Sequence, residues 1–194
     1  MTILSRALVS EKQYADAARM LEQALVIQEH VYGAVHPRVA STLNELGRVA
    51  VSLDQLDKAE TYFQRELAIY RAVYDDKHYL IGVALSNLSG VALERKNYDK
   101  AEALLHDALA RYASTLPPDH QLIGIGRVRL GHVLLREKRF AEAGSESRAG
   151  YDLLTKKSGS SVTWIQTARE DLAAEHDSLQ RPELAAKAHD GQKQ

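Results

Sequence analysis

The stretch that decides the fold is HPRVASTLNELGR at residues 36–48, because its features return at a fixed interval along the chain. Its histidine, His36, has counterparts at His78 and His120, and the three positions are 42 residues apart. A repeat of this length indicates stacked copies of one small unit of secondary structure rather than a single domain built around a pocket. The period therefore favours binding over catalysis.

Four further series of residues keep the same interval. Leucine recurs at Leu4, Leu46, Leu88, Leu130 and Leu172. A small residue follows each leucine, at Ser5, Gly47, Ser89, Gly131 and Ala173. Thirteen residues after each leucine stands an alanine, at Ala17, Ala59, Ala101, Ala143 and Ala185, and three residues before that alanine stands Tyr14, Leu56, Tyr98, Phe140 or Pro182. The repeat thus extends over nearly the whole chain.

Each repeat is predicted to form two helices. The spacing of Leu43, Leu46, Ala50 and Leu53 places them on one helical face, and a longer second face is formed by Ala59, Phe63, Leu67, Tyr70 and Tyr74. We expect Asp54, and Asn97 one repeat later, to cap the second helix. The small residue of the first helix and the alanine of the second allow a close crossing. A larger side chain there would overpack the contact, at a cost of about 1–3 kcal/mol.

This pattern resembles the tetratricopeptide repeat, with Leu43, Leu46, Gly47, Ala59 and Phe63 in one unit and Leu85, Leu88, Ser89, Tyr98, Ala101 and Ala108 in the next. The period of 42 and the connecting segment at residues 32–40 resemble the long-period repeats of kinesin light chain, as does the segment at residues 42–46. The resemblance implies an all-α fold, a right-handed superhelical solenoid of antiparallel helix pairs.

The resemblance covers residues 1–186, and residues 187–194 are a polar tail. We expect a partial unit at 1–35, complete units at 36–77, 78–119 and 120–161, and a degenerate cap at 162–186. The N-terminal end carries apolar residues where an array normally needs a polar face, at Ile3, Leu4, Leu8 and Val9. Three explanations remain open: a longer chain, pairing of the chain with itself, or docking on a partner.

Composition limits the other classes of function. The chain has 194 residues, a net charge of −1 and no cysteine, so no bulk attraction to nucleic acid is implied and disulfides and thiolate metal sites are excluded. No apolar run approaches the about 18 residues of a membrane span, and the start lacks the features of a signal peptide. We expect a cytoplasmic protein without a membrane or nucleic-acid partner.

The periodic histidines invite a metal site, but their spacing argues against one. Zinc needs ligand nitrogens about 2.0–2.1 Å from one ion. Equivalent residues of stacked units should lie on the order of 10 Å apart, given helix spacings of about 8–10 Å. We therefore expect each histidine to shape the loop before its helix. No other set of residues fits a reaction, so the sequence predicts no enzyme, no cofactor and no metal.

The resemblance also implies where a partner would bind, because the first helices of such repeats line a concave groove and positions at fixed offsets from the leucine touch the ligand. Carried onto this chain, the groove positions are Ser41, Asn44, Arg48, Val83, Ser86, Leu93, Ile125, Val128, His132 and Leu135. The alternative, that some of the apolar ones pack against the adjacent unit, stays open. A basic stretch at residues 127–139 is most simply a solvated helix face.

The leading hypothesis is a non-enzymatic scaffold that holds a protein or peptide segment in this groove. A second hypothesis is a C-terminal docking or regulatory repeat region of a signalling protein, because residues 180–187 resemble the end of repeat arrays that follow bacterial Ser/Thr kinase domains. A third is a regulator that senses small peptides. Self-association through the N-terminal end is compatible with each of them.

Overall fold

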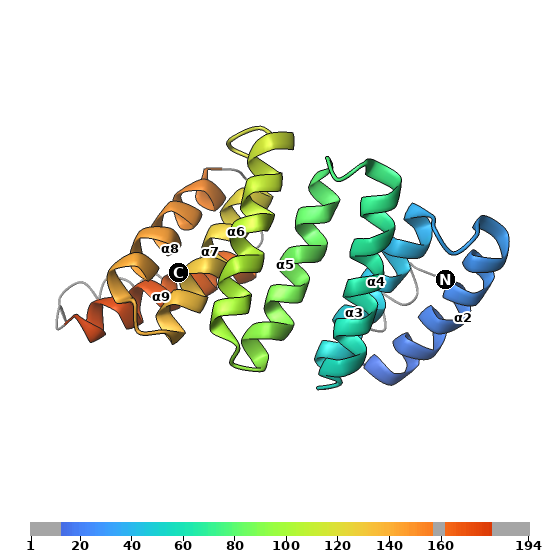
Figure 1. The fold of residues 1–194 in the computed structure, drawn as a ribbon. Coiled ribbons are helices and arrows are strands. Elements are labelled where there is room, and N and C mark those ends of the chain that lie inside the picture. Colours follow the sequence, from blue (N-terminus) through green and yellow to red (C-terminus); the bar gives the residue numbers. More distant parts are fainter. Residues whose placement is uncertain (1–12, 157–161, 180–194) are drawn as a thin grey trace. The chain divides into compact units, whose positions relative to one another are not determined.

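The computed structural model describes residues 13–156 and 162–179, and these residues form eight α-helices and no strand (Figure 1). The first helices of successive repeats are α3 (Pro37–Ser52), α5 (Tyr79–Glu94) and α7 (Gln121–Arg136), each beginning 42 residues after the previous one. The second helices are α2 (Tyr14–Tyr32), α4 (Leu56–Tyr74), α6 (Tyr98–Thr115) and α8 (Phe140–Thr155), followed by α9 (Val162–Ser178). The predicted all-α fold of helix pairs is confirmed.

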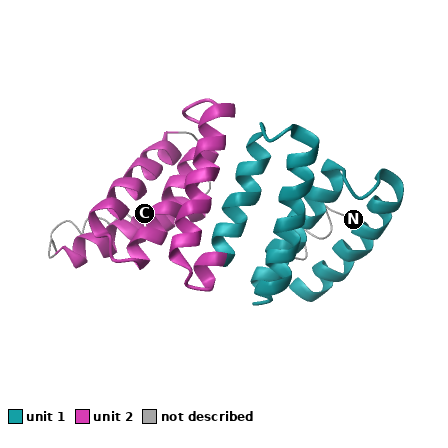
Figure 2. Cartoon of the chain, viewed as in Figure 1, with its two compact units in different colours: residues 1–91 teal, residues 92–194 magenta. Residues whose placement is uncertain are grey.

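The chain divides into two compact units, residues 1–91 and residues 92–194 (Figure 2). In the first unit, α3 packs against α2 and α4. In the second unit, α7 packs against α6, α8 and α9, and α8 also packs against α9. In both units, therefore, a first helix lies between second helices.

The periodic histidines cap the first helices. Nδ1 of His36 accepts a hydrogen bond from the backbone N–H of Arg38 at 3.1 Å. His78 and His120 accept in the same way from the N–H groups of Leu80 and Leu122, both at 3.2 Å. Two of the rings also stack on the tyrosine that ends the preceding helix, with centroids 4.7 Å apart for Tyr32 and His36 and 4.1 Å apart for Tyr74 and His78. The expectation that each histidine shapes the loop before its helix is confirmed.

The turn inside each repeat has a second periodic feature. Asp54, Lys96 and Lys138 all adopt left-handed backbone conformations, with φ of 57°, 59° and 64°. The expectation that Asp54 caps α4 is therefore wrong, because this residue forms the turn and Gln55 precedes the helix without a side-chain cap. Asn97 does cap α6, since its side chain accepts a hydrogen bond from the N–H of Lys100 at 3.2 Å.

Small residues on the first helices permit the close approach of the paired second helix. A Cβ atom on Gly47 would lie 2.3 Å from Cε1 of Phe63, and one on Gly131 would lie 2.2 Å from Oγ of Ser147. Phe63 and Ser147 occupy the same repeat position, which Leu105 holds between them. The predicted close crossing is present, although the neighbour of Gly47 is the phenylalanine ring rather than the alanine Ala59.

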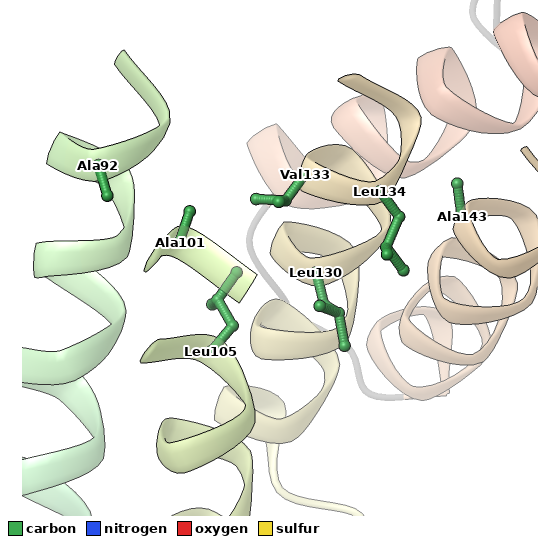
Figure 3. Packing of buried hydrophobic residues seen from close by; sticks show 7 residues of the cluster. All are labelled: Ala92, Ala101, Leu105, Leu130, Val133, Leu134 and Ala143. Carbon is green, nitrogen blue, oxygen red and sulfur yellow. The ribbon is translucent and has the colours of Figure 1, made fainter. Parts of the chain in front are cut away.

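One core cluster of the second unit follows the same pattern. Its buried side chains come from the end of α5 and from α6, α7 and α8 (Figure 3), and they are Ala92, Ala101, Leu105, Leu130, Val133, Leu134 and Ala143. Leu130 and Ala101 belong to the leucine and alanine series of the sequence. The apolar N-terminal residues Ile3 to Val9, and the tail from Lys187, lie outside the described residues.

Substitutions of His78 should separate the stability that comes from the helix cap from the stability that comes from ring stacking. His78→Ala should destabilise the chain by about 1 kcal/mol for the lost cap and by about 0.5–1.5 kcal/mol for the lost stacking on Tyr74. His78→Asn keeps an acceptor for the Leu80 N–H and should lose only the stacking part. His120 follows Leu116 instead of a tyrosine, so His120→Asn should be close to neutral. Urea unfolding measures all three variants, and equal losses for His78→Asn and His78→Ala would show that the cap contributes nothing.

Replacing Gly47 should reveal the close contact with Phe63. Gly47→Ala should destabilise the chain by about 1–3 kcal/mol through overpacking, which outweighs the gain of up to about 1 kcal/mol in helix propensity. Adding Phe63→Leu removes the ring that the new β-carbon would meet, and leucine already stands at this repeat position in Leu105. The double variant should therefore be more stable than the two single losses predict when added. Simple additivity in urea unfolding would contradict the contact.

Candidate functional site

In the first unit, three of the predicted groove residues lie on α3. Ser41, Asn44 and Arg48 are spaced three and four residues apart, so they share one face of the helix. Ser41 and Arg48 are exposed, and a guanidinium nitrogen of Arg48 lies 3.8 Å from a carboxylate oxygen of Glu45. Asn44 is half-buried. This face of α3 therefore offers a hydroxyl, an amide and a cation at the surface, while Leu43 and Leu46 of the same helix lie in the core.

The neighbouring first helix, α5, meets α3 through an amide pair. The Asn87 side chain donates a hydrogen bond from Nδ2 to Oδ1 of Asn44 at 3.2 Å. Of the two predicted groove residues on this part of α5, Val83 is half-buried and Ser86 is buried, with 5% of its surface exposed. In this unit the accessible predicted positions thus lie mainly on α3.

In the second unit the predicted apolar positions lie closer to the core. Leu93 and Leu135 are half-buried and pack against the cluster of Figure 3, and Ile125 packs against Leu154 and its neighbours. Val128 is fully buried and belongs to the core. Its place follows from Gly150 on α8, because a Cβ atom there would lie 2.6 Å from Cγ2 of Val128. Val128 therefore follows the packing alternative and cannot touch a ligand at the surface.

His132 is the partly exposed polar member of the predicted set in the second unit. Its Nδ1 lies 2.7 Å from Oδ1 of Asp171 on α9, and the two side chains are 28% and 4% exposed. Burial raises the pKa of Asp171, and the hydrogen bond to His132 acts against that shift. On the same face of α7, the guanidinium of Arg129 lies 4.9 Å from the centre of the Trp164 ring. These contacts join the first helix α7 to α9.

The basic stretch at residues 127–139 is held largely by contacts within the second unit. Arg127 forms an ion pair with Glu146 at 2.9 Å. Arg139 pairs with Glu102 and Glu142 at 2.8 Å each and with Glu137 at 3.0 Å. These pairs, with the stacking of Arg129, favour the interpretation of this stretch as a structural helix face.

Two residues near the α3 surface were not predicted from the sequence. Asn87 donates a hydrogen bond to Asn44, and Glu66 on α4 is fully buried. Burial raises the pKa of Glu66 to about 8, Asn87 acts to lower it, and Glu45 on α3 raises it. Glu66 stands at the repeat position of Ala24, Ala108 and Gly150. A comparison of the repeats at that position was the signal that could have found it.

Metal-ligand clusters, hollows and membrane-spanning helices were compared with the predicted groove in the described part of the chain. No group of three or more His, Asp or Glu side chains in residues 13–156 and 162–179 is arranged to hold a metal ion. A hollow of about 210 Å³ lies among α2, α3 and α4 of the first unit, and none of the ten predicted groove residues lines it. No helix in this part of the chain is both long and apolar enough to cross a membrane.

Comparison with solved structures finds the same fold in several proteins. Kinesin light chain repeats from Podosopora anserina are 19% identical with a TM-score of 0.76, and the match covers 97% of this chain and 89% of that one. BtubC (BKLC) from P. vanneervenii is 14% identical with a TM-score of 0.81, over 99% of this chain and 76% of that chain. A Rap protein complexed with competence and sporulation factor is 17% identical with a TM-score of 0.81, over 96% of this chain and 50% of that one.

The predicted resemblance to long-period repeats of the kinesin light chain type is thus confirmed at the level of the fold. Comparison with curated protein sequences gives no match. The sequence profile of the tetratricopeptide repeat matches residues 2–72 and 51–114, which is more than half of the chain. The 42-residue period, the helix pairs and this match lead to one conclusion: the chain belongs to the tetratricopeptide repeat family.

Proposed function

We propose that this chain is a non-enzymatic scaffold that holds a segment of another protein, or a peptide, against its first helices. The observation that carries the proposal is the α3 face of the first unit. Ser41 and Arg48 are exposed there, and Asn44 is half-buried and held by Asn87. Polar groups on a rigid helix, supported by a second helix, are suited to hold an extended chain by hydrogen bonds.

The similar structures support a protein or peptide as the ligand. One of them is a Rap protein complexed with competence and sporulation factor. A small peptide ligand is therefore a narrower form of the same function. Ion pairing of Arg127 and Arg139 leaves less basic charge for nucleic acid, which also supports a protein partner.

Changing the α3 face should weaken binding while the fold persists. The double variant Asn44→Ala, Arg48→Ala should capture its partner from an extract of the source cell several-fold less well, as mass spectrometry of the retained proteins would measure. The loss of the Asn87 hydrogen bond should cost only about 0.5–1.5 kcal/mol of stability. Lys58→Ala removes an exposed cation from α4 and should bind normally. Undiminished capture by the double variant would argue against recognition on α3.

Self-association through the N-terminal end remains part of this proposal. It is supported by exposed apolar side chains in the C-terminal half of α2 and in the loop after it, since Val26, Ile27, Val31 and Val35 are 66%, 52%, 60% and 61% exposed. Ile69, one repeat after Ile27, is only 4% exposed. Apolar surface of this kind is typical of contact sites.

Light scattering tests the self-association. We expect the apparent mass to rise with protein concentration, and we expect Val31→Glu to keep the chain monomeric because a charge in an apolar contact costs several kcal/mol. Val162, which is 79% exposed in the second unit, provides the control Val162→Glu, and this variant should associate as the parent does. A constant monomer mass for the parent chain at all concentrations would exclude pairing.

A further inference from the structure

The hollow of about 210 Å³ among α2, α3 and α4 of the first unit (Figure 1) has a counterpart in the second unit that is occupied by charged side chains. There, Arg139 stands immediately before α8. Its guanidinium forms ion pairs at 2.8 Å, 3.0 Å and 2.8 Å with three carboxylates from α6, from the residue after α7 and from α8, namely Glu102, Glu137 and Glu142. One arginine side chain and its ion pairs thus hold this corner between three helices.

The first unit lacks this network at the same repeat positions. Two repeats earlier in the sequence, Gln55 takes the place of Arg139. The three carboxylates are replaced, in the same order, by Ala18, Leu53 and Lys58. All four of these residues line the hollow. The hollow is therefore the corner in which the first unit has neither the arginine nor its carboxylates.

The floor of the hollow is apolar. Leu46, Val49 and Ala50 of α3 line it and are 1%, 3% and 4% exposed. Ala15 and Ala18 line it from α2. Its volume is below the about 300–1,000 Å³ of a pocket that holds a whole small molecule. The hollow therefore suits a single large side chain, and an aromatic anchor in such a pocket is a common source of binding energy between proteins.

The charged residues that line the hollow are two cations and one carboxylate, on Arg19, Lys58 and Glu22. Arg19 forms an ion pair with Asp16. Lys58 is exposed, and its ammonium group makes no ion pair or hydrogen bond with another residue in the described part of the chain. In the second unit the same position holds a carboxylate that is paired. An occupant with a negative charge beside its apolar part therefore complements the hollow.

The hollow and the candidate surface use opposite faces of α3. Leu46 lies two residues from both Asn44 and Arg48, and Ala50 lies two residues beyond Arg48. Two residues correspond to about half a turn of an α-helix. Changes in the hollow therefore leave the α3 surface in place, in agreement with the use of Lys58→Ala as a control for that surface.

We propose that the hollow is a second binding site, which takes one large apolar side chain of a partner protein together with a neighbouring carboxylate that pairs with Lys58. This site is separate from the proposed function on α3, so each can fail without the other. A charge-assisted contact at the rim fixes the orientation of the segment, and the apolar floor removes the anchoring side chain from water.

The probe for this site is a capped dipeptide, N-acetyl-phenylalanyl-aspartate amide, added to the whole chain. Nuclear magnetic resonance follows the methyl signals of Val49 and Leu53, and both should shift and reach saturation at millimolar probe. The matched probe with asparagine in place of aspartate has the same shape without the charge and should bind several-fold more weakly. The probe with alanine in place of phenylalanine should cause no shift. Methyl signals that stay in place with the first probe, or equal binding of the aspartate and asparagine probes, would overturn the proposal.

Two variants locate the binding. Lys58→Ala should weaken the aspartate probe to the level of the asparagine probe and leave the asparagine probe unchanged. The triple variant Ala18→Glu, Gln55→Arg, Lys58→Glu installs in the first unit residues that form the network of the second unit. It should bind neither probe, while its melting temperature is at least that of the parent. Shifts that persist in the triple variant, or a loss in Lys58→Ala that is the same for both probes, would contradict the site.

The double variant Asn44→Ala, Arg48→Ala is the control for the other face of α3. It should bind the aspartate probe as the parent does, whatever its capture of a partner from the extract. Loss of probe binding in this variant would show that the two surfaces are not separate and would overturn the assignment of the probe to the hollow.

Discussion

The close approach of paired helices, α3 with α4 in the first unit and α7 with α8 in the second, is the constraint on which the rest of this structure depends. At Gly47 and Gly131 there is no room for a β-carbon, because Phe63 in one repeat and Ser147 in another already fill the space. The distance between the paired helices is therefore set by residues that lack bulk. Leucines next to these small residues can then reach the core, and the pattern must return at the same interval in every repeat.

A different side chain, the periodic histidine, stabilises the connection between one repeat and the next. A histidine before each of α3, α5 and α7 accepts a hydrogen bond from the backbone N–H of the second residue of the helix, a bond for which asparagine or serine would also serve. The ring adds what those residues cannot supply, since His36 and His78 stack on the tyrosine that ends the previous helix. One side chain thus fixes both the start of a helix and its relation to the helix before it.

The fold could be predicted from the sequence because these constraints recur. The period located the helix pairs. The second helices α2, α4, α6 and α8 begin at the members of one residue series, Tyr14, Leu56, Tyr98 and Phe140. The site could be predicted less completely, because exposure depends on what another helix provides. Val128 is buried since Gly150 leaves room for it, and Asp54 forms a left-handed turn that its preference for helix caps does not reveal. Such outcomes follow from pairs of positions rather than from single residues.

One such pair shows how two repeat positions can change from apolar to polar residues while the fold stays the same. Asn44 and Glu66 occupy the repeat positions that Val128 and Gly150 occupy two repeats later. In the second unit both residues are apolar. The larger one, Val128, lies on α7 and belongs to the core. In the first unit the same positions hold an amide and a carboxyl group. Burial of that carboxyl group has a cost in stability, and the cost rises with pH because the pKa of Glu66 is raised. This cost in stability falls on the first unit, where α3 presents polar groups. The second unit has Val128 and Gly150 at the same two repeat positions and buries no carboxyl group there.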